Sequence, residues 1–259
     1  MSNNISNLEH FQPRKFVAEG VDFTRFEEIK PYYEKLLAAQ IDSAEALEAW
    51  VLERSEFDSV LDEAGSILYI NMTCQTDDAA RAKAYQEYIQ TVSPAIKPYE
   101  DQLNRQFLEL NEKYPLDEER YLVYVREIKA DVELFCEANI ELETQVDLLS
   151  QEYQTIIGAQ TVEFEGSEQT IPQMGKYLLE TDRDLRERAW KATYARRKQD
   201  TEKLEEIFDK MIGLRDQIAK NAGCKNYAEY KFRDLHRFDY TVDDCKAYHA
   251  SIEKCVVPL

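Results

Sequence analysis

The sequence predicts an all-α fold of long antiparallel helices with one short β-hairpin near residues 160–171. Glycine and proline each occur only seven times in 259 residues, where average usage gives roughly 18 and 13, so turns should be few. Several long segments repeat apolar residues at positions i, i+3, i+4 and i+7, the spacing of an amphipathic helix. Residues 161–164 alone alternate apolar and polar side chains, as a strand does.

The first part of the chain predicts two helices after a polar, irregular start over residues 1–22. Residues 24–40 should form a helix that Pro31 kinks or ends early. Asp42 is the expected N-cap of the next helix, with Glu45 at its third helical position. One apolar stripe runs along that helix and contains Phe57, Val60, Leu61, Ala64 and Leu68.

Prolines should divide the next segment, which covers residues 75–115. Pro94 and Pro98 are expected to break or bend its helix, and Pro115 to end it. From about Asp117 one helical region should run past residue 156, because its apolar residues keep helical spacing over about eight turns. This stripe contains Ile128, Val132, Phe135, Leu142, Val146, Leu149, Tyr153 and Ile156.

Asn139 lies within that apolar stripe. We expect it to be buried with its hydrogen bonds satisfied, or to lie at the solvated edge of the stripe, rather than to act in a site. After residue 158, "EGSE" predicts the turn of the hairpin and "QTI" its return strand. A two-stranded hairpin is marginal alone and needs a helix to pack against.

The last part of the chain predicts several capped helices. Thr181 and Asp184 form an expected capping box. The following stripe contains Leu204, Ile207, Phe208, Met211, Ile218 and Ala222. Gly223 fits the left-handed position just after a helix end. Asn226 with Glu229, and Thr241 with Asp244, predict two further helix starts, the last helix ending near Pro258.

The net charge of −19 argues against nucleic-acid or membrane-surface binding, because such a field repels phosphate groups. A solvated acidic surface is the simplest reading, and an acidic groove for cationic ligands is the alternative. Five cysteines form no CxxC pair, which favours a reducing compartment. Without an apolar signal region or a run of about 18 apolar residues, we expect a cytoplasmic protein.

No motif in the sequence assembles an active site. Phosphate-binding glycine loops, GxSxG and HExxH are all absent, and the three histidines are His10, His236 and His249. The pairs Asp77/Asp78 and Asp243/Asp244 are expected to be helix-start charges. We therefore assign no catalytic, cofactor-binding or metal-binding residue.

Two further features have a structural and a functional interpretation. The basic cluster "YARRKQ" at residues 194–199 should pair with acidic neighbours, or alternatively bind a peptide carboxylate. Trp50 and Trp190 are most simply explained as packing in the core or at its edge.

Two phrases of the sequence nevertheless resemble a known family. "LLSQEYQTIIGAQTVEFEGSEQTIPQMGKYLLETDRDLRERAWKATYARR" is similar to the oligoendopeptidase F-like branch of the thimet oligopeptidase superfamily of zinc metallopeptidases. The matching residues are Tyr153, Ile156, Gly158, Glu165, Gly166, Glu168, Thr170, Asp182, Arg183, Arg186 and Ala189. "RDQIAKNAGCKNYAEYKFRD", Arg215 to Asp234, resembles the family's "R..IAK..G..NY.EY". The helices up to Asp77 look similar with less distinctive motifs.

The resemblance implies a helical peptidase whose deep channel admits short unfolded peptides. In such a family, HExxH and a later carboxylate hold zinc, and the glutamate between the histidines activates the metal-bound water. No residue of this sequence matches those positions, so zinc is expected in the complete enzyme and not on this chain. The expected partners are oligopeptide substrates and a C-terminal catalytic part, with no nucleic acid and no membrane.

The resemblance also implies a domain plan. Residues 1–180 would form an N-terminal helical lobe that ends in the small hairpin. Residues 181–259 would begin the helical catalytic domain, truncated before the zinc motif, so that this chain alone is inactive. The alternative is a stand-alone, non-catalytic helical module that binds peptides or a protein. Truncation predicts an apolar patch larger than a few hundred Å², and a stand-alone module predicts a polar outer face on the last helix. A coiled-coil scaffold fits poorly, because the stripes follow the 3.6-residue period and are interrupted.

Overall fold

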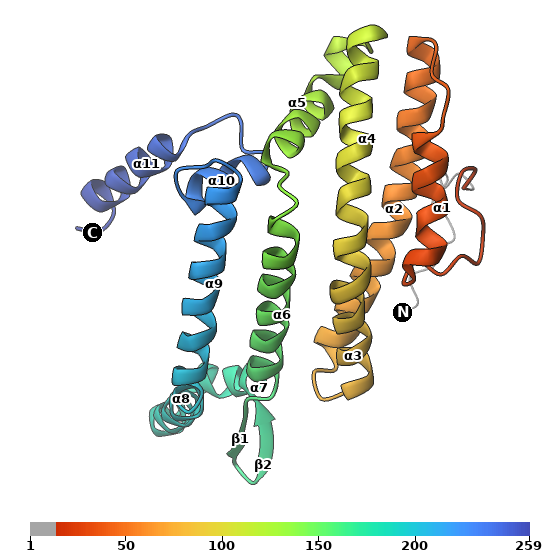
Figure 1. The fold of residues 1–259 in the computed structure, drawn as a ribbon. Helices are drawn as coiled ribbons and strands as arrows, with labels where there is room; N and C mark the ends of the chain where they lie inside the picture. Colours follow the sequence, from red (N-terminus) through yellow and green to blue (C-terminus); the bar gives the residue numbers. More distant parts are fainter. Residues whose placement is uncertain (1–13) are drawn as a thin grey trace.

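A computed structural model describes residues 14–259 of the chain. Long helices lie side by side and one hairpin hangs from the lower end of the layer (Figure 1). The elements are α1 (Phe26–Leu37), α2 (Ala44–Cys74), α3 (Ala79–Glu87), the π-helical turn η2 (Tyr88–Val92), α4 (Ser93–Lys113), α5 (Glu118–Leu134), α6 (Asn139–Gly158), β1 (Thr161–Phe164), β2 (Ser167–Thr170), α7 (Ile171–Met174), the 3₁₀ turn η3 (Gly175–Leu179), α8 (Arg183–Lys198), α9 (Thr201–Asn221), α10 (Tyr227–Asp234) and α11 (Val242–Cys255). The predicted all-α class with one hairpin is confirmed. Within the described residues, no helix is both long enough and apolar enough to cross a membrane.

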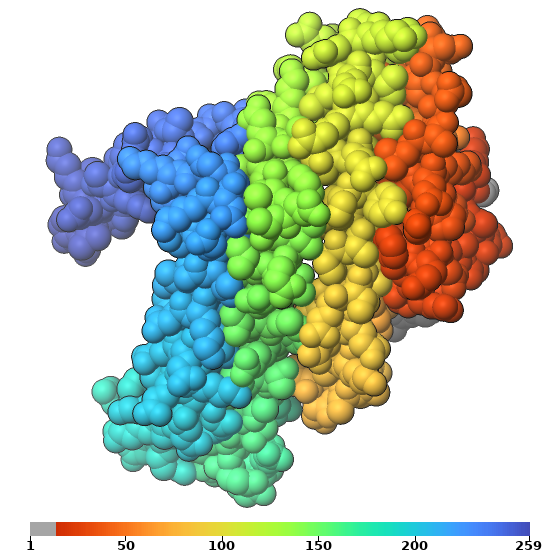
Figure 2. All heavy atoms as spheres, in the orientation of Figure 1, coloured from red at the N-terminus to blue at the C-terminus, as the bar shows by residue number. Residues whose placement is uncertain are grey.

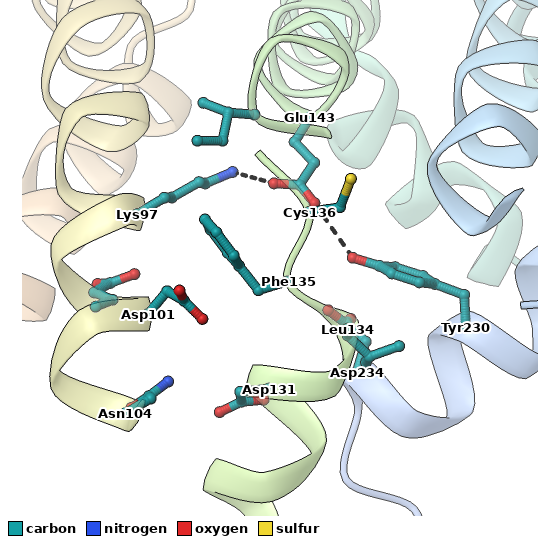
Figure 3. Close-up of a pocket in the computed structure, with 12 residues that line it drawn as sticks. Lys97, Asp101, Asn104, Asp131, Leu134, Phe135, Cys136, Glu143, Tyr230 and Asp234 are labelled. Carbon is teal, nitrogen blue, oxygen red and sulfur yellow. Dashed lines mark hydrogen bonds and ion pairs between the residues drawn. The ribbon is translucent and has the colours of Figure 1, made fainter. Parts of the chain in front are cut away.

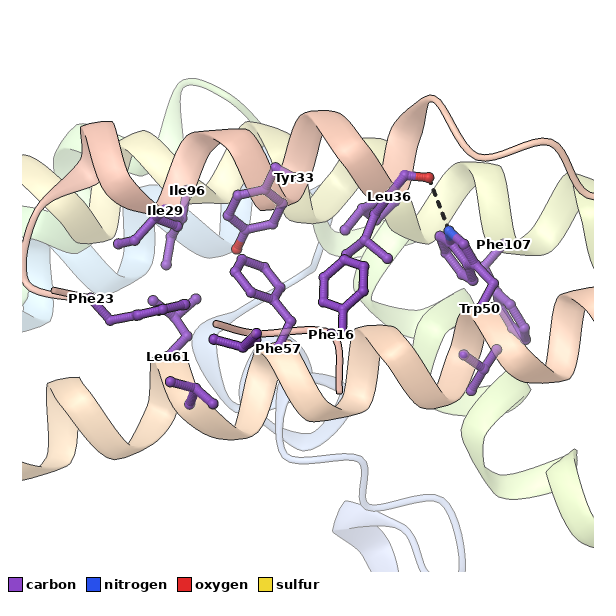
Figure 4. Close-up of a cluster of buried hydrophobic side chains, with 14 of the residues drawn as sticks. Phe16, Phe23, Ile29, Tyr33, Leu36, Trp50, Phe57, Leu61, Ile96 and Phe107 are labelled. Atoms are coloured by element: carbon purple, nitrogen blue, oxygen red, sulfur yellow. Dashed lines mark hydrogen bonds between the residues drawn. The ribbon is translucent and has the colours of Figure 1, made fainter. Parts of the chain in front are cut away.

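An aromatic cluster holds the N-terminal helices together (Figure 4). Tyr33 and Phe57 are fully buried, and their rings meet edge to face with centroids 4.8 Å apart. Trp50 is 2% exposed and donates a hydrogen bond of 3.0 Å from Nε1 to the Leu36 carbonyl oxygen. Large aromatic side chains contribute much of the area that stabilises such a core. The stripe predicted around Phe57 faces this cluster, as expected.

The prolines interrupt the helices less than predicted. Pro31 and Pro98 lie inside α1 and α4, which continue past them. Before Pro94 the chain widens into η2, where the Ser93 N–H donates to the Tyr88 carbonyl oxygen. Such a π turn places the missing N–H of Pro94 near the start of α4, where proline is tolerated. The expected break is therefore a local widening, while α4 ends at Lys113 before Pro115 as predicted.

The single helix predicted from Asp117 to beyond residue 156 is wrong. Two helices occupy this region, α5 and α6, and Phe135 between them has an extended backbone with φ −60° and ψ 127°. The apolar spacing continues across the break because the two helices bury different faces. Leu134 packs in a cluster with Ile218 and Tyr230 on α9 and α10. The spacing of apolar residues alone does not reveal that the chain changes direction between α5 and α6.

Asn139 is buried with its hydrogen bonds satisfied, as the sequence predicted. It starts α6 and is 2% exposed. Its Nδ2 donates to the Ile218 carbonyl oxygen at 3.0 Å, and its Oδ1 accepts from Asn221 Nδ2 at 2.8 Å. The side chain therefore joins the start of α6 to the end of α9 with partners that a buried amide requires.

The lower end of α6 packs tightly on the α2–α3 turn. A Cβ added at Gly158 would overlap the side chain of Thr76. Gln151, two turns earlier, donates from Nε2 to the Ala82 carbonyl oxygen at 2.8 Å. Gly158 is thus required here for close approach, which gives a physical reason for the glycine in the "Y..I.G" phrase.

The hairpin is confirmed, with a return strand two residues earlier than "QTI". β1 and β2 pair antiparallel, with Thr161 opposite Thr170 and Phe164 opposite Ser167. Glu165 and Gly166 form the two-residue turn with positive φ of 49° and 78°, the backbone that favours a tight hairpin. The hairpin packs on α8 through the cluster of Val162, Phe164, Met174 and Ala189, which supplies the helix support it was expected to need.

Two predicted helix caps are wrong by one residue. Ser43, and not Asp42, caps α2 by accepting from the Ala46 N–H at 3.1 Å. Asp182, and not Thr181, caps α8 by accepting from the N–H of Asp184. In each pair both neighbouring residues favour the N-cap position. The residue with the extended backbone of a cap occupies that position.

The corner after α9 matches the prediction closely. Gly223 has a φ of 72°, its N–H donates to the Lys220 carbonyl oxygen, and the Cys224 N–H donates to that of Ala219. This pair of bonds is the Schellman arrangement, in which the left-handed residue is usually glycine. Asn226 caps α10, and Thr241 with Asp244 forms the capping box of α11. Phe208, by contrast, lies on the α9 stripe but is 57% exposed.

We predict that Asn139→Ala lowers the free energy of unfolding by about 1–3 kcal/mol, because it removes the two hydrogen bonds by which a buried amide joins α6 to α9. Chemical denaturation monitored by circular dichroism measures the change. The matched control, Gln102→Ala at an exposed position of α4, should change stability by less than about 0.5 kcal/mol. An Asn139 variant as stable as the control would contradict this role.

Candidate functional site

A polar cavity of about 220 Å³ lies where α4, the α5–α6 break and α10 meet (Figure 3). Its lining comes from all three places and consists of Lys97, Glu100, Asp101, Asn104, Asp131, Leu134, Phe135, Cys136, Ile140, Glu143, Tyr230 and Asp234. Figure 3 shows Lys97 and Asp101 facing Glu143, Asp131 and Tyr230 across the space. Five of the twelve lining residues are carboxylates and one is a lysine, so the cavity is acidic.

The break between α5 and α6 positions this cavity. α5 ends at Leu134 and α6 begins at Asn139, and Phe135 and Cys136 between them line the cavity together with residues of α4. The Asn226 cap starts α10 opposite this gap, and Tyr230 follows one turn later. A continuous helix over the same residues would present an unbroken surface to α4, so the interruption and the cavity have one cause.

Glu143 is the centre of the hydrogen bonds across the cavity. Lys97 Nζ lies 2.5 Å from Glu143 Oε2, and the Tyr230 hydroxyl donates to Glu143 Oε1 at 3.3 Å. These contacts link α4, α6 and α10. Burial, together with the nearby charge of Glu143, raises the pKa of the Tyr230 hydroxyl, so this group remains a neutral donor.

A second cavity of about 250 Å³ adjoins the first and shares Glu100, Asn104 and Asp131 with it. Arg54 lines it from α2, is buried, and donates from Nη2 to Asn104 Oδ1 at 2.6 Å. Burial first, and then the charge of Asp58, raises the pKa of the Glu100 carboxyl group. Burial likewise raises the pKa of the Asp58 carboxyl group. These carboxylates are therefore held in an environment that disfavours their charged form.

The predicted absence of catalytic, cofactor and metal residues stays a prediction. His236 lies just after α10 with Nε2 2.8 Å from Asp131 Oδ1, and His249 lies on α11. His10 is outside the described residues. Between residues 14 and 259, no group of three histidine, cysteine or acidic side chains is arranged to hold a metal ion. The residues present do not fit a zinc site, and no catalytic step is derived from zinc on this chain.

Several other residues singled out in the sequence have structural roles. Asp78 caps α3 and Asp244 belongs to the capping box of α11, as predicted for helix-start charges. In the basic cluster, Arg196 Nη1 pairs with Asp200 Oδ2 at 2.6 Å. Trp50 lies in the core as predicted, and Trp190 is 49% exposed on α8, so of the two predicted positions only the edge of the core fits Trp190.

The cavity carboxylates were not found from the sequence, although a signal was present. Glu100 and Asn104 lie on the same side of α4 as the buried residues Leu103 and Phe107. A charged residue inside an apolar stripe is expensive to bury unless it has partners, so it marks a polar site. The abundance of carboxylates hid this signal, and the partners on α6 and α10 are distant in sequence.

Comparison with known proteins finds a family match in the N-terminal region. Residues 20–135 match the family model of the peptidase M3 N-terminal domain. No curated protein sequence matches the chain. The resemblance noted in the two central phrases is therefore supported independently by the N-terminal helices, where the sequence motifs were less distinctive.

Three solved structures share the fold. One is assigned as an oligoendopeptidase F, with a TM-score of 0.81 and 20% identity over 95% of this chain and 44% of that chain. A second, assigned as an oligoendopeptidase F from Bacillus anthracis strain Ames, has a TM-score of 0.80 and 20% identity over 96% and 44%. PZ peptidase A, solved with an inhibitor, has a TM-score of 0.80 and 23% identity over 96% and 43%.

These matches confirm the resemblance to the N-terminal portion of oligoendopeptidase F-like peptidases. This chain spans less than half the length of each matched structure. Nearly all of its helices have counterparts there, because the similarity covers at least 95% of the chain.

We predict that Glu100→Gln raises the free energy of unfolding at pH 8 by about 1–2 kcal/mol, because it removes a partly buried charge. The pKa of Glu100 is raised in the folded protein above its ordinary value of 4.5. The free energy of unfolding of the wild type therefore falls as the pH rises from 4.5 through the folded-state pKa. Below pH 4.5 the two proteins should converge. Thermal or urea unfolding between pH 4 and 8 measures this, with the exposed Glu112→Gln as control. If Glu100→Gln were equally destabilising at pH 8 and at pH 4, the charge of Glu100 would not be unfavourable in the folded protein.

Proposed function

We propose that this chain forms the N-terminal part of a zinc-dependent oligoendopeptidase that hydrolyses peptide bonds in short unfolded peptides. The observation that carries the proposal is the similarity of at least 95% of the chain to oligoendopeptidase folds, together with the peptidase M3 N-terminal match over residues 20–135. The two phrases of the central region add support, because they cover helices that lie beyond that domain match.

In the complete enzyme, these helices would form one wall or lid of the substrate channel and limit the size of the substrate. The acidic cavity supports such a place, since it opens between the N-terminal helices and α10 and is lined by polar groups from both. We propose the domain boundary near residue 180, between an N-terminal lobe and the first helices of the catalytic domain. The zinc ligands and the general base would come from that catalytic domain beyond the residues described here.

Two apolar grooves along α6 and α9 are the surfaces where the catalytic part would pack. One, of about 360 Å³, is lined by Ser150, Tyr153, Gln154, Leu204, Ile207, Phe208 and Met211. The other, of about 530 Å³, is lined by Gln145, Leu148, Leu149, Lys210, Gly213 and Leu214. Exposed apolar residues in such grooves are typical of interaction surfaces. They support this reading, because truncation predicts exposed apolar surface where the rest of the enzyme would pack.

The compartment is also part of the proposal. All five cysteines are free thiols, from Cys74 to Cys255, which fits a reducing environment. We therefore place the enzyme in the cytoplasm, with oligopeptides as substrates and neither nucleic acid nor membrane as a partner.

We predict that the purified 259-residue chain neither cleaves a quenched fluorescent oligopeptide nor retains stoichiometric zinc after dialysis, because the proposal places both functions in the other part of the enzyme. Fluorescence release and metal analysis are the measurements, with an active oligoendopeptidase F as positive control. Cleavage that a chelator abolishes and zinc restores would contradict the proposal that catalysis and zinc binding belong to the other part of the enzyme. A single defined species in sedimentation, with the grooves protected from hydrogen exchange, would favour the stand-alone module instead.

A further inference from the structure

α8 is a basic helix in an acidic protein. Its sixteen residues contain seven basic and two acidic side chains, a net charge of +5. The whole chain has a charge of −19, so the remaining residues together carry −24. A cluster of one sign inside a field of the opposite sign concentrates attraction for oppositely charged partners at that place.

The two sides of α8 have different surroundings. Ala189 and Thr193 are buried, and Ala189 packs on the hairpin in the cluster with Val162 and Phe164. An exposed side of the helix carries Arg183, Trp190, Tyr194 and Arg197, which recur at helical spacing. This outer face, which we call the basic aromatic face, also includes Lys198.

Trp190 and Tyr194 lie on this outer face and pack on each other. Their ring centroids are 4.4 Å apart, and the planes meet at 36°. They are 49% and 51% exposed, so the pair is ordered without being buried in the core. Tryptophan, tyrosine and arginine are the residue types that contribute most often to binding energy at protein interfaces.

The cations of the basic aromatic face differ from the other basic residues of α8 in their partners. Arg188, Lys191 and Arg196 pair with Glu165, Glu187 and Asp200. Arg186 instead donates to the Glu180 and Thr181 carbonyl oxygens. Among the described residues, no ion pair within 4.0 Å is formed by Arg183, Arg197 or Lys198. The predicted pairing of the basic cluster with acidic neighbours therefore holds for Arg196 but leaves the outer cations available.

We propose that the basic aromatic face of α8 is a docking surface for an acidic polypeptide segment that contains an apolar or aromatic residue. Arg197 and Lys198 contact the carboxylates of the segment through charge-assisted hydrogen bonds, and Trp190 with Tyr194 contacts its apolar side chain. The protein's net charge of −19 repels a nucleic acid, with one charge per about 1.7 Å of duplex, more strongly than a short peptide with a few carboxylates, so a short acidic peptide is the partner that this surface fits. This goes beyond the proposed peptidase function and does not depend on it.

Trp190 provides the measurement, because the only other tryptophan, Trp50, is buried in the core. A short glutamate-rich peptide with a central phenylalanine is titrated into the full 259-residue chain while tryptophan emission is recorded. We expect a saturable change that is absent in Trp190→Phe. We expect at least a tenfold loss of affinity with a matched peptide that has glutamine in place of glutamate, and about as large a loss in high salt.

The double variant Arg197→Gln and Lys198→Gln should weaken binding of the acidic peptide about tenfold. Its control, Lys246→Gln with Lys254→Gln on α11, removes the same charge elsewhere and should bind as the wild type does. Tyr194→Ser tests the aromatic contribution without any change of charge. Circular dichroism confirms that each variant is folded, which is expected because these side chains are exposed.

Four outcomes would overturn the proposal. The glutamine peptide could bind as tightly as the glutamate peptide, or the α11 control could weaken binding as much as the α8 variant. An oligothymidylate that competes with equal or higher affinity would identify nucleic acid as the partner. Sedimentation that reveals self-association lost in the α8 double variant would identify a second copy of this chain as the occupant.

Discussion

The packing of α6 between α4 and α9 is the constraint on which the rest of the structure depends. α6 contacts α4, η2 and α2 on one side and α9 on the other, so it joins the N-terminal helices to the later ones. The space-filling view shows α4, α6 and α9 as adjoining bands of one surface, with α11 projecting beyond them (Figure 2). Asn139 joins one end of α6 to α9, and Gly158 lets the other end approach the α2–α3 turn.

This arrangement also produces the polar cavity. α6 starts afresh at Asn139 instead of continuing α5, so a gap remains beside α4 in which Lys97, Glu143 and Tyr230 meet. The carboxylates around them are partly desolvated, which keeps the pKa of Glu100 and of Asp58 above their usual values. Partly desolvated carboxylates at this junction lower the stability of the fold. Carboxylates with a shifted pKa are also common at functional sites.

Much of the fold followed from the sequence because it depends on local chemistry. The Gly223 corner, the Thr241 capping box and the turn at Glu165 and Gly166 each have a residue type that the backbone requires. The α5–α6 break did not follow, since its cause is tertiary. Apolar spacing persisted through Phe135 while the helices buried different faces. The caps at Ser43 and Asp182 were missed by one residue because adjacent residues have similar cap preferences.

The candidate site was less predictable than the fold. Its members come from α4, α5, α6 and α10, and no short motif connects them. The sequence also left open whether Trp190 lies in the core or at its edge, because helical spacing alone does not give the exposure of an aromatic side chain.

The most direct test of the peptidase assignment is the nucleotide sequence that follows the codon for Leu259. The assignment predicts an open reading frame that continues and encodes HExxH on a predicted helix, followed by a later acidic ligand. A stop codon directly after Leu259, confirmed in the genomic DNA and accompanied by accumulation of the folded 259-residue product, would contradict it.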